Sequence, residues 1–157
     1  MEIKSVFREG ETVPERYTCD GRNINPPLDF SGIPKGTKSL ALIIDDPDSP
    51  SGVFTHWIVW NIPLDNKAIK ENSVPRGSVQ GLNDFGQAGY GGPCPHQGIH
   101  RYRFRVFALD VLLAVPTNPV KDYISKAMDG HVLDSAVLTG VYGREGMGEN
   151  NRKRRGR

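Results

Sequence analysis

The stretch DDPDSPSGVFTHWIVWNIP, residues 45–63, joins two apolar runs through a proline-rich loop that carries two aspartates. The preceding run, SLALIID at 39–45, is continuously apolar and bounded by turn signals, which predicts a buried strand. The following run, residues 54–62, alternates two sets of side chains, which are Phe54, His56, Ile58 and Trp60 on one face and Trp57 and Val59 on the other. Both faces are expected to be buried, which places this strand inside a sheet.

A third strand is predicted at HRYRFRVFALD, residues 100–110, where arginine alternates with apolar or aromatic residues. The charged outer face carries Arg101, Arg103 and Arg105. His100 and Tyr102 point the same way as the core and form the polar end of an apolar face, as at the mouth of a pocket. The segment SAVLTGVYG, residues 135–143, is a further candidate strand.

One helix is predicted, at residues 118–130. Its apolar residues recur with helical spacing at Val120, Tyr123, Ile124, Ala127 and Met128. Asn118 suits the N-cap, Pro119 the first helical position and Gly130 the C′ position. Residues 21–36 and 81–98 are rich in glycine and proline and are predicted as long loops, which in compact domains commonly carry function.

Length and composition predict one globular domain, because 157 residues match the usual size of a single domain. No apolar run approaches the ~18 residues of a membrane span. The amino-terminal residues do not resemble a secretory signal, so a cytoplasmic location is expected. Cys19 and Cys94 are too few for a disulfide framework or a zinc site, and either two free thiols or one disulfide is compatible with the sequence.

Charge is unevenly distributed along the chain. Five of the twenty basic residues lie in 152–157, so residues 1–151 carry fifteen basic against eighteen acidic groups, a net charge of about −3. We therefore predict a folded domain at 1–145 and a separate basic tail at 146–157. A basic tail of this kind can associate with nucleic acid or an anionic membrane surface, which is one of three functional hypotheses.

The ionisable groups at strand ends and in proline-restricted loops predict an anion-binding pocket. The residues concerned are Asp46, Asp48, His56, His100 and Tyr102. Imidazole, phenol and the backbone amides of GYGG (89–92) offer donors to phosphate or carboxylate oxygens. One aspartate is expected to accept a hydrogen bond from a histidine ring and favour imidazolium, and the other to receive a ligand ammonium group.

Other interpretations of the same residues remain open. A single histidine in a strand is more often a core residue than a ligand, and DPDSP can be a simple turn. An EF-hand-like loop beginning at Asp46 is disfavoured because Pro50 and Ser51 stand where an oxygen ligand and a glycine belong. A site of two histidines and one carboxylate for zinc or iron stays possible, although no metal or cofactor is predicted.

The chain resembles the phosphatidylethanolamine-binding protein family, in particular its prokaryotic Raf-kinase-inhibitor-like branch. The resemblance covers residues 5–144 and rests on segments in the family's order, which are CDGRNINPPLDFSGIP, SLALIIDDPDSP, THWIVWNIP, GLNDFGQAGYGGPCP, GIHRYRFRVFALD and AMDGHVLDSAVLTGVYGR. The DPDxP and GxHRY signatures together are highly specific. Two departures are His96, where this branch commonly has proline, and the basic tail, which has no counterpart in the family core.

The resemblance implies a mostly β fold in which a large antiparallel sheet packs on a smaller one, with a few peripheral helices. It also implies a pocket for phosphate or phosphoethanolamine head groups. The pocket residues carried over are Asp46, Asp48, His56, Gly92, Pro93, Pro95, His100 and Tyr102.

The expected function is that of a non-enzymatic binding and regulatory protein, whose pocket recognises a phosphorylated head group or side chain. Family members that inhibit kinases or serine proteases make such enzymes the expected partners, and a homodimer is expected by analogy with prokaryotic relatives. The alternative is a small hydrolase with Cys94 as nucleophile and His56, His96 or His100 as base.

Overall fold

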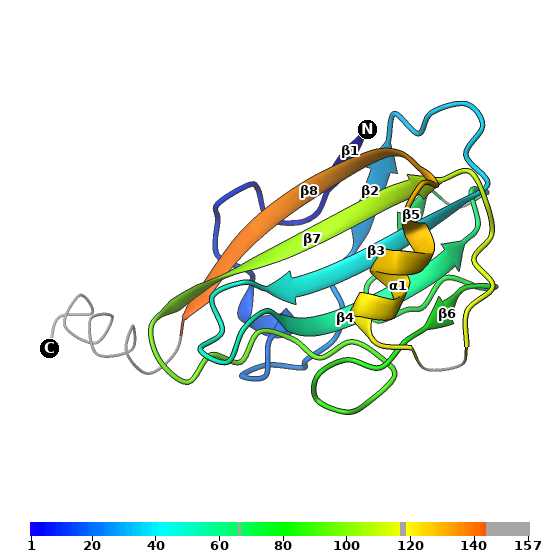
Figure 1. Ribbon diagram of the computed structural model, residues 1–157. Coiled ribbons are helices and arrows are strands. Elements are labelled where there is room, and N and C mark those ends of the chain that lie inside the picture. Colours follow the sequence, from blue (N-terminus) through cyan, green and yellow to red (C-terminus); the bar gives the residue numbers. More distant parts are fainter. Residues whose placement is uncertain (66, 117–118, 144–157) are drawn as a thin grey trace, which may run out of the picture.

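The computed structural model describes residues 1–65, 67–116 and 119–143 and contains two antiparallel sheets packed face to face (Figure 1). The smaller sheet has the order β1-β2-β5, with β1 at Glu2–Lys4, β2 at Leu28–Ser31 and β5 at Ala68–Ile69. The larger sheet has the order β6-β4-β3-β7-β8, with β3 at Ser39–Asp46, β4 at Phe54–Ile62, β6 at Val79–Gln80, β7 at Ile99–Leu109 and β8 at Val132–Gly143. The expected fold of a large sheet on a smaller one is confirmed.

The two faces of the large sheet bury different apolar clusters. Between the sheets, Trp57 and Phe104 of the large sheet pack with Leu28 and Phe30 of the small one. The other face is covered across β3 and β4 by helix α1, Lys121–Met128, as Figure 1 shows. This double coverage explains why every residue of β3 is buried and why that strand is a nearly continuous apolar run.

A β-bulge in β4 decides the direction of His56. The register shifts between the Ile44–Trp57 and Asp45–Thr55 pairs, which leaves His56 without a partner opposite it on β3. An extra residue breaks the two-residue alternation of a strand. The predicted shared face of His56, Ile58 and Trp60 is therefore wrong, because the His56 ring contacts Tyr102 between the sheets, whereas Ile58 and Trp60 pack in the cluster beneath α1.

Helix α1 is shorter than predicted. Val120 is its N-cap, so Pro119 precedes the helix instead of occupying its first position, and Asn118 lies outside the described residues. Gly130, with φ of +81°, follows the C-cap Asp129 as predicted for C′. Ile124 and Met128 are buried against the sheet, Ala127 is partly buried and Tyr123 is exposed. The helix therefore contacts the sheet through a narrower apolar stripe than the sequence predicts.

Strand β2 lies within residues 21–36, which the sequence predicts as a loop. Leu28 and Phe30 are buried and Asp29 and Ser31 are exposed, so the strand alternates normally. The prolines before it and Gly32 after it produced the loop prediction. A short 3-10 helix at Glu15–Tyr17 was also not predicted, whereas β8 is confirmed and begins three residues before the predicted start at 135.

Cys19 and Cys94 form a disulfide, with their Cα atoms 5.4 Å apart. The bond connects the glycine- and proline-rich loop 81–98 to the segment that follows the 3-10 helix. Among the described residues, no helix is long and apolar enough to cross a membrane. The domain boundary at 145 and the basic tail at 146–157 lie outside the described residues and stay predictions.

Candidate anion-binding site

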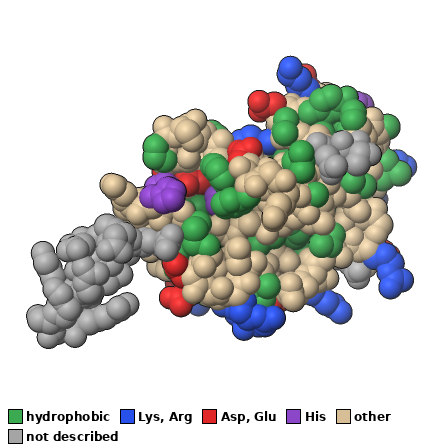
Figure 2. Space-filling model, turned by 90° about the horizontal axis from the view of Figure 1, so that it is seen from below, with side chains coloured by type: hydrophobic (Ala, Val, Ile, Leu, Met, Phe, Trp, Pro, Cys, Tyr) green, Lys and Arg blue, Asp and Glu red, His purple; other side chains and the backbone are tan. Residues whose placement is uncertain are grey.

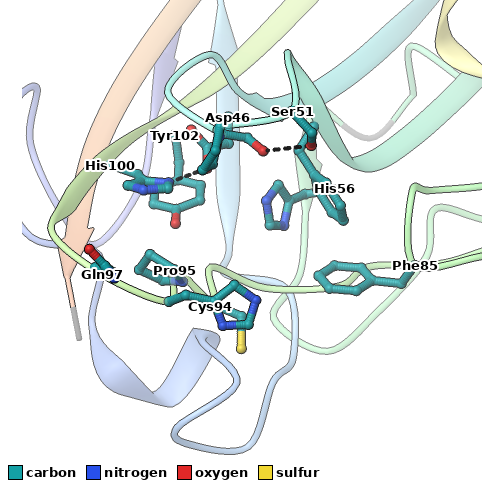
Figure 3. A pocket seen from close by; sticks show the side chains of 13 residues that line it. Asp46, Ser51, His56, Phe85, Cys94, Pro95, Gln97, His100 and Tyr102 are labelled. Carbon is teal, nitrogen blue, oxygen red and sulfur yellow. Dashed lines mark hydrogen bonds and ion pairs between the residues drawn. The ribbon is translucent and has the colours of Figure 1, made fainter. Parts of the chain in front are cut away.

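A cavity of about 600 Å³ opens at the end of the large sheet where β3 ends and where β4 and β7 begin. Figure 3 shows the rings of His100 and His56 on opposite sides of it, with Asp46 above them and the Cys94–Pro95 segment below. The lining residues are Asp46, Ser49, Pro50, Ser51, Phe54, His56, Phe85, Cys94, Pro95, His96, Gln97, His100 and Tyr102. Seen from below in Figure 2, histidine, acidic and hydrophobic side chains gather at one end of the molecule.

His56 is held in one orientation by the loop beneath it. Its Nδ1 atom donates to the carbonyl oxygen of Gly91 at 2.6 Å, while the Gly91 amide donates to the His56 carbonyl at 3.0 Å. A ring that donates from Nδ1 keeps Nε2 for a ligand. Burial lowers the pKa of His56 below its ordinary value, against the opposing effects of the Gly91 carbonyl and of Asp46. The neutral ring therefore offers Nε2 as an acceptor at neutral pH.

His100 is oriented by Asp46, as one of the sequence expectations proposed. The His100 Nδ1 atom donates to Asp46 Oδ2 at 2.6 Å, which again leaves Nε2 free to meet a ligand. Asp46 Oδ1 accepts the backbone amide of Asp48 at 2.7 Å, in a turn that the intervening proline stiffens. The carboxylate of Asp46 is thus engaged through both oxygens, and the residue is 4% exposed.

The Tyr102 side chain lines the cavity. The hydroxyl is buried and, within the described part of the chain, forms no hydrogen bond, although the Cys94 amide is near enough to lower its pKa slightly. Burial, followed by the charges of Asp46 and Asp48, raises the pKa of Tyr102 well above its ordinary range. The phenol stays protonated, so its O–H group can donate a hydrogen bond to an acceptor on a ligand.

Three of the predicted pocket residues lie beside the cavity and not on its wall. Asp48 turns to β7, where Arg101 donates to it from the backbone amide and Nε at 2.9 Å and from Nη2 at 2.7 Å. Gly92 donates to Asn23 Oδ1, and the Pro93 carbonyl accepts from the Cys19 amide. These contacts attach the loop to the amino-terminal segment, and a Cβ at Gly92 would lie 2.2 Å from the Tyr17 carbonyl oxygen.

Several lining residues were not predicted as pocket residues. Phe85 is 47% exposed, and its ring centroid lies 4.8 Å from that of Phe54 and 5.5 Å from that of His56. No periodic pattern marks a residue in a long loop, so only the folded loop brings Phe85 here. His96, a departure from the family pattern that the sequence analysis considered only as a base of the hydrolase alternative, also lines the cavity.

The hydrolase alternative loses its nucleophile, because Cys94 Sγ is bonded to Cys19 and cannot be a thiolate. The described residues include no cluster of three histidine, cysteine or acidic side chains that could hold a metal ion. What the site offers is two oriented imidazoles and one phenol, a set that suits oxyanion recognition.

Comparison with known proteins assigns the family. The family model described as phosphatidylethanolamine-binding protein matches residues 3–143. A UPF0098 protein of Methanothermobacter thermautotrophicus is 51% identical over 150 residues, covering 92% of this chain and 99% of the relative. The crystal structure of a putative phosphatidylethanolamine-binding protein homologue from Chlamydia trachomatis superimposes with a TM-score of 0.87 at 40% identity, covering 92% of this chain and 97% of that one. For Escherichia coli YbcL, described as a new member of the mammalian PEBP family, the TM-score is 0.86 at 34% identity, covering 92% of this chain and 98% of that one. The chain therefore belongs to the phosphatidylethanolamine-binding protein family.

Proposed function

We propose that this protein is a non-enzymatic binding and regulatory protein whose cavity recognises phosphate-type groups. The group belongs to a phosphoethanolamine head group or to a phosphorylated side chain, and its recognition modulates a partner such as a kinase or serine protease. One observation supports this most: His56 and His100 each donate from Nδ1 to a protein oxygen, which leaves Nε2 for a ligand, and the Tyr102 side chain lines the same cavity.

These atoms suit a phosphoryl group in its different protonation states. A phosphate oxygen accepts a hydrogen bond from Tyr102. The neutral His56 ring accepts a hydrogen bond at Nε2 from a monoprotonated phosphate, and a protonated ring donates one from Nε2 to a dianion. Phe54 and Pro95 contribute apolar surface to the cavity wall beside these groups. The proline-restricted loops reduce the entropy lost when the site is ordered.

A direct test is an NMR titration of histidine ring signals with phosphoethanolamine. The His56 and His100 signals are expected to shift together and saturate. His131, whose Nδ1 atom lies 2.9 Å from Asp110 Oδ1 outside the cavity, is an internal control that should not move. His56→Gln and His100→Gln should each weaken binding about tenfold or more, the size of a lost hydrogen bond to a charged group, whereas His131→Gln should not. Absence of a saturable shift at both His56 and His100 would remove the assignment.

The regulatory part has its own test. The purified protein is added to kinase and serine protease assays with and without saturating phosphoethanolamine. If the cavity takes a phosphorylated side chain of the partner, inhibition should fall as the small ligand fills the site. Inhibition that the ligand does not change would place the partner surface elsewhere on the molecule.

A further inference from the structure

The acidic groups around the cavity are all engaged within the described residues. Asp46 is the single acidic side chain on the wall. Its Oδ2 accepts from His100 at 2.6 Å, its Oδ1 accepts from the Asp48 amide at 2.7 Å, and little of it reaches solvent. An ammonium group entering the cavity would have to share a carboxylate that is already occupied.

Asp48, the other aspartate of the loop, is also unavailable to a cationic ligand. It lies off the cavity wall and receives three N–H groups of Arg101, two of them in the bidentate geometry that guanidinium forms with carboxylate. The negative charge of Asp48, one of the two aspartates considered for a ligand amine, is therefore paired with Arg101. The sequence expectation of an ammonium site on one of the two aspartates therefore lacks a carboxylate to support it.

The rest of the cavity wall carries no acidic side chain in the part of the chain that the structure describes. A volume of about 600 Å³ falls in the range that encloses whole small ligands, so the cavity can hold more than a phosphoryl group. Beyond the rings of His56, His96 and His100, the wall includes Phe54, Phe85 and Pro50, with neutral polar groups at Ser49, Ser51 and Gln97. The aromatic rings can attract an ammonium group, but at sites this exposed the gain is about fivefold at most.

Resting on the proposed function, we propose that the cavity selects phosphomonoesters with an uncharged, apolar ester group and does not recognise the amine of phosphoethanolamine. The phosphoryl group meets His56, His100 and Tyr102, and the ester group lies against Phe54 and Phe85. Selectivity among phosphomonoesters then follows apolar contact area, not charge.

The test compares three probes by calorimetry on the full chain: ethyl phosphate, phosphoethanolamine and butyl phosphate. Ethyl phosphate and phosphoethanolamine differ by the amine and should bind within about fivefold of each other. Butyl phosphate adds two methylene groups and should bind about tenfold more tightly than ethyl phosphate. A more than tenfold preference for phosphoethanolamine over ethyl phosphate would overturn the inference while leaving the proposed function standing. Failure of all three to bind would overturn both.

Variants locate the apolar contact. Phe85→Ala should weaken the binding of butyl phosphate by about tenfold and that of ethyl phosphate by much less. Phe85→Leu should restore part of the lost affinity for butyl phosphate. The matched control is Leu112→Ala, an exposed apolar residue beyond the far end of β7 from His100, which should leave all affinities unchanged. Because the Phe85 ring packs against Gly91, an equal loss for every probe would mean that it only supports the His56 loop, and would overturn the apolar contact.

Discussion

At the scale of single residues, the proposed function depends on the ring atoms of His56 and His100 that do not hydrogen-bond to the described part of the chain. His56 is 3% exposed and neutral at pH 7 because burial lowers its pKa. An anion at Nε2 favours the charged ring and opposes that effect. If the cavity binds an anion as proposed, we therefore expect binding to be coupled to proton uptake at His56.

The first prediction is a pH dependence of binding. Above pH 6.5, where His56 is neutral in the free protein, the affinity for phosphoethanolamine should fall as pH rises, by at most about tenfold per pH unit. Calorimetry in two buffers of different ionisation enthalpy measures the proton uptake, which should approach one proton per ligand. His56→Gln should bind more weakly and without this uptake, and an unchanged uptake would assign the proton to another group.

Asp48 gives the second prediction. Its hydrogen bonds with Arg101 hold the pKa of Asp48 at about 2, below the ordinary 3.8. A depressed pKa adds stability above pH 3.8 that is lost as pH falls through about 2. Asp48→Asn should therefore lower the free energy of unfolding by about 1 kcal/mol or less at neutral pH, since the pair is partly exposed. Urea denaturation at several pH values should show this difference vanish near pH 2; a constant difference would contradict the ionic origin.

At the scale of elements, the outward arginines of β7 do more than face solvent. Arg103 Nε and Arg105 Nη2 donate to the fully buried Asp45 at 2.8 and 2.7 Å, and Lys121 Nζ of α1 lies 3.5 Å from the same carboxylate. The charged outer face predicted from the alternation is thus partly a buried ion cluster. It joins β3, β7 and α1, and it explains why an aspartate ends an apolar strand.

The third prediction concerns this cluster. Asp45→Asn leaves three cations close together without their carboxylate and should lower the free energy of unfolding by about 3 kcal/mol. The matched control is Asp134→Asn. The Asp134 side chain is 44% exposed and pairs with the amino terminus, so this substitution should lower the free energy of unfolding by less than about 1 kcal/mol. Urea denaturation measures both; equal, small losses would show that the cations are adequately solvated without Asp45.

At the scale of the whole molecule, long-range links hold the cavity loop. The disulfide spans 75 residues, and beside it the Cys19 amide donates to the Pro93 carbonyl and the Tyr90 hydroxyl to the Tyr17 carbonyl. Disulfides are rare in the cytosol of mesophiles, so this bond weighs against the expected cytoplasmic location, which stays a prediction.

The fourth prediction tests the disulfide. A cross-link that closes so long a loop should stabilise the fold by about 2 to 4 kcal/mol. Cys19→Ser with Cys94→Ser, or the wild type under reducing conditions, should therefore unfold at lower urea concentration than the oxidised protein. Quantitative alkylation of two thiols in the native protein without reductant would show instead that the bond does not form.

Local patterns were enough to predict the longer strands of the large sheet and helix α1. The apolar run of β3, the alternation of β7 and the helical spacing around Ile124 arise from short-range periodicity, which the residues carry themselves. The residue types of DPDxP and GxHRY likewise indicated a pocket of aspartates, histidines and a tyrosine. Of those ionisable residues, Asp46, His56, His100 and Tyr102 lie together on the cavity wall.

Only the tertiary structure decided which partner each of these groups has. The bulge that turns His56, the removal of Asp48 from the cavity by Arg101 and the contribution of Phe85 all depend on contacts between residues distant in the chain. The bond between Cys19 and Cys94 is of the same kind. A sequence states which donors and acceptors are present, but a hydrogen bond or an ion pair requires atoms within about 3 to 4 Å, and only the folded chain sets those distances.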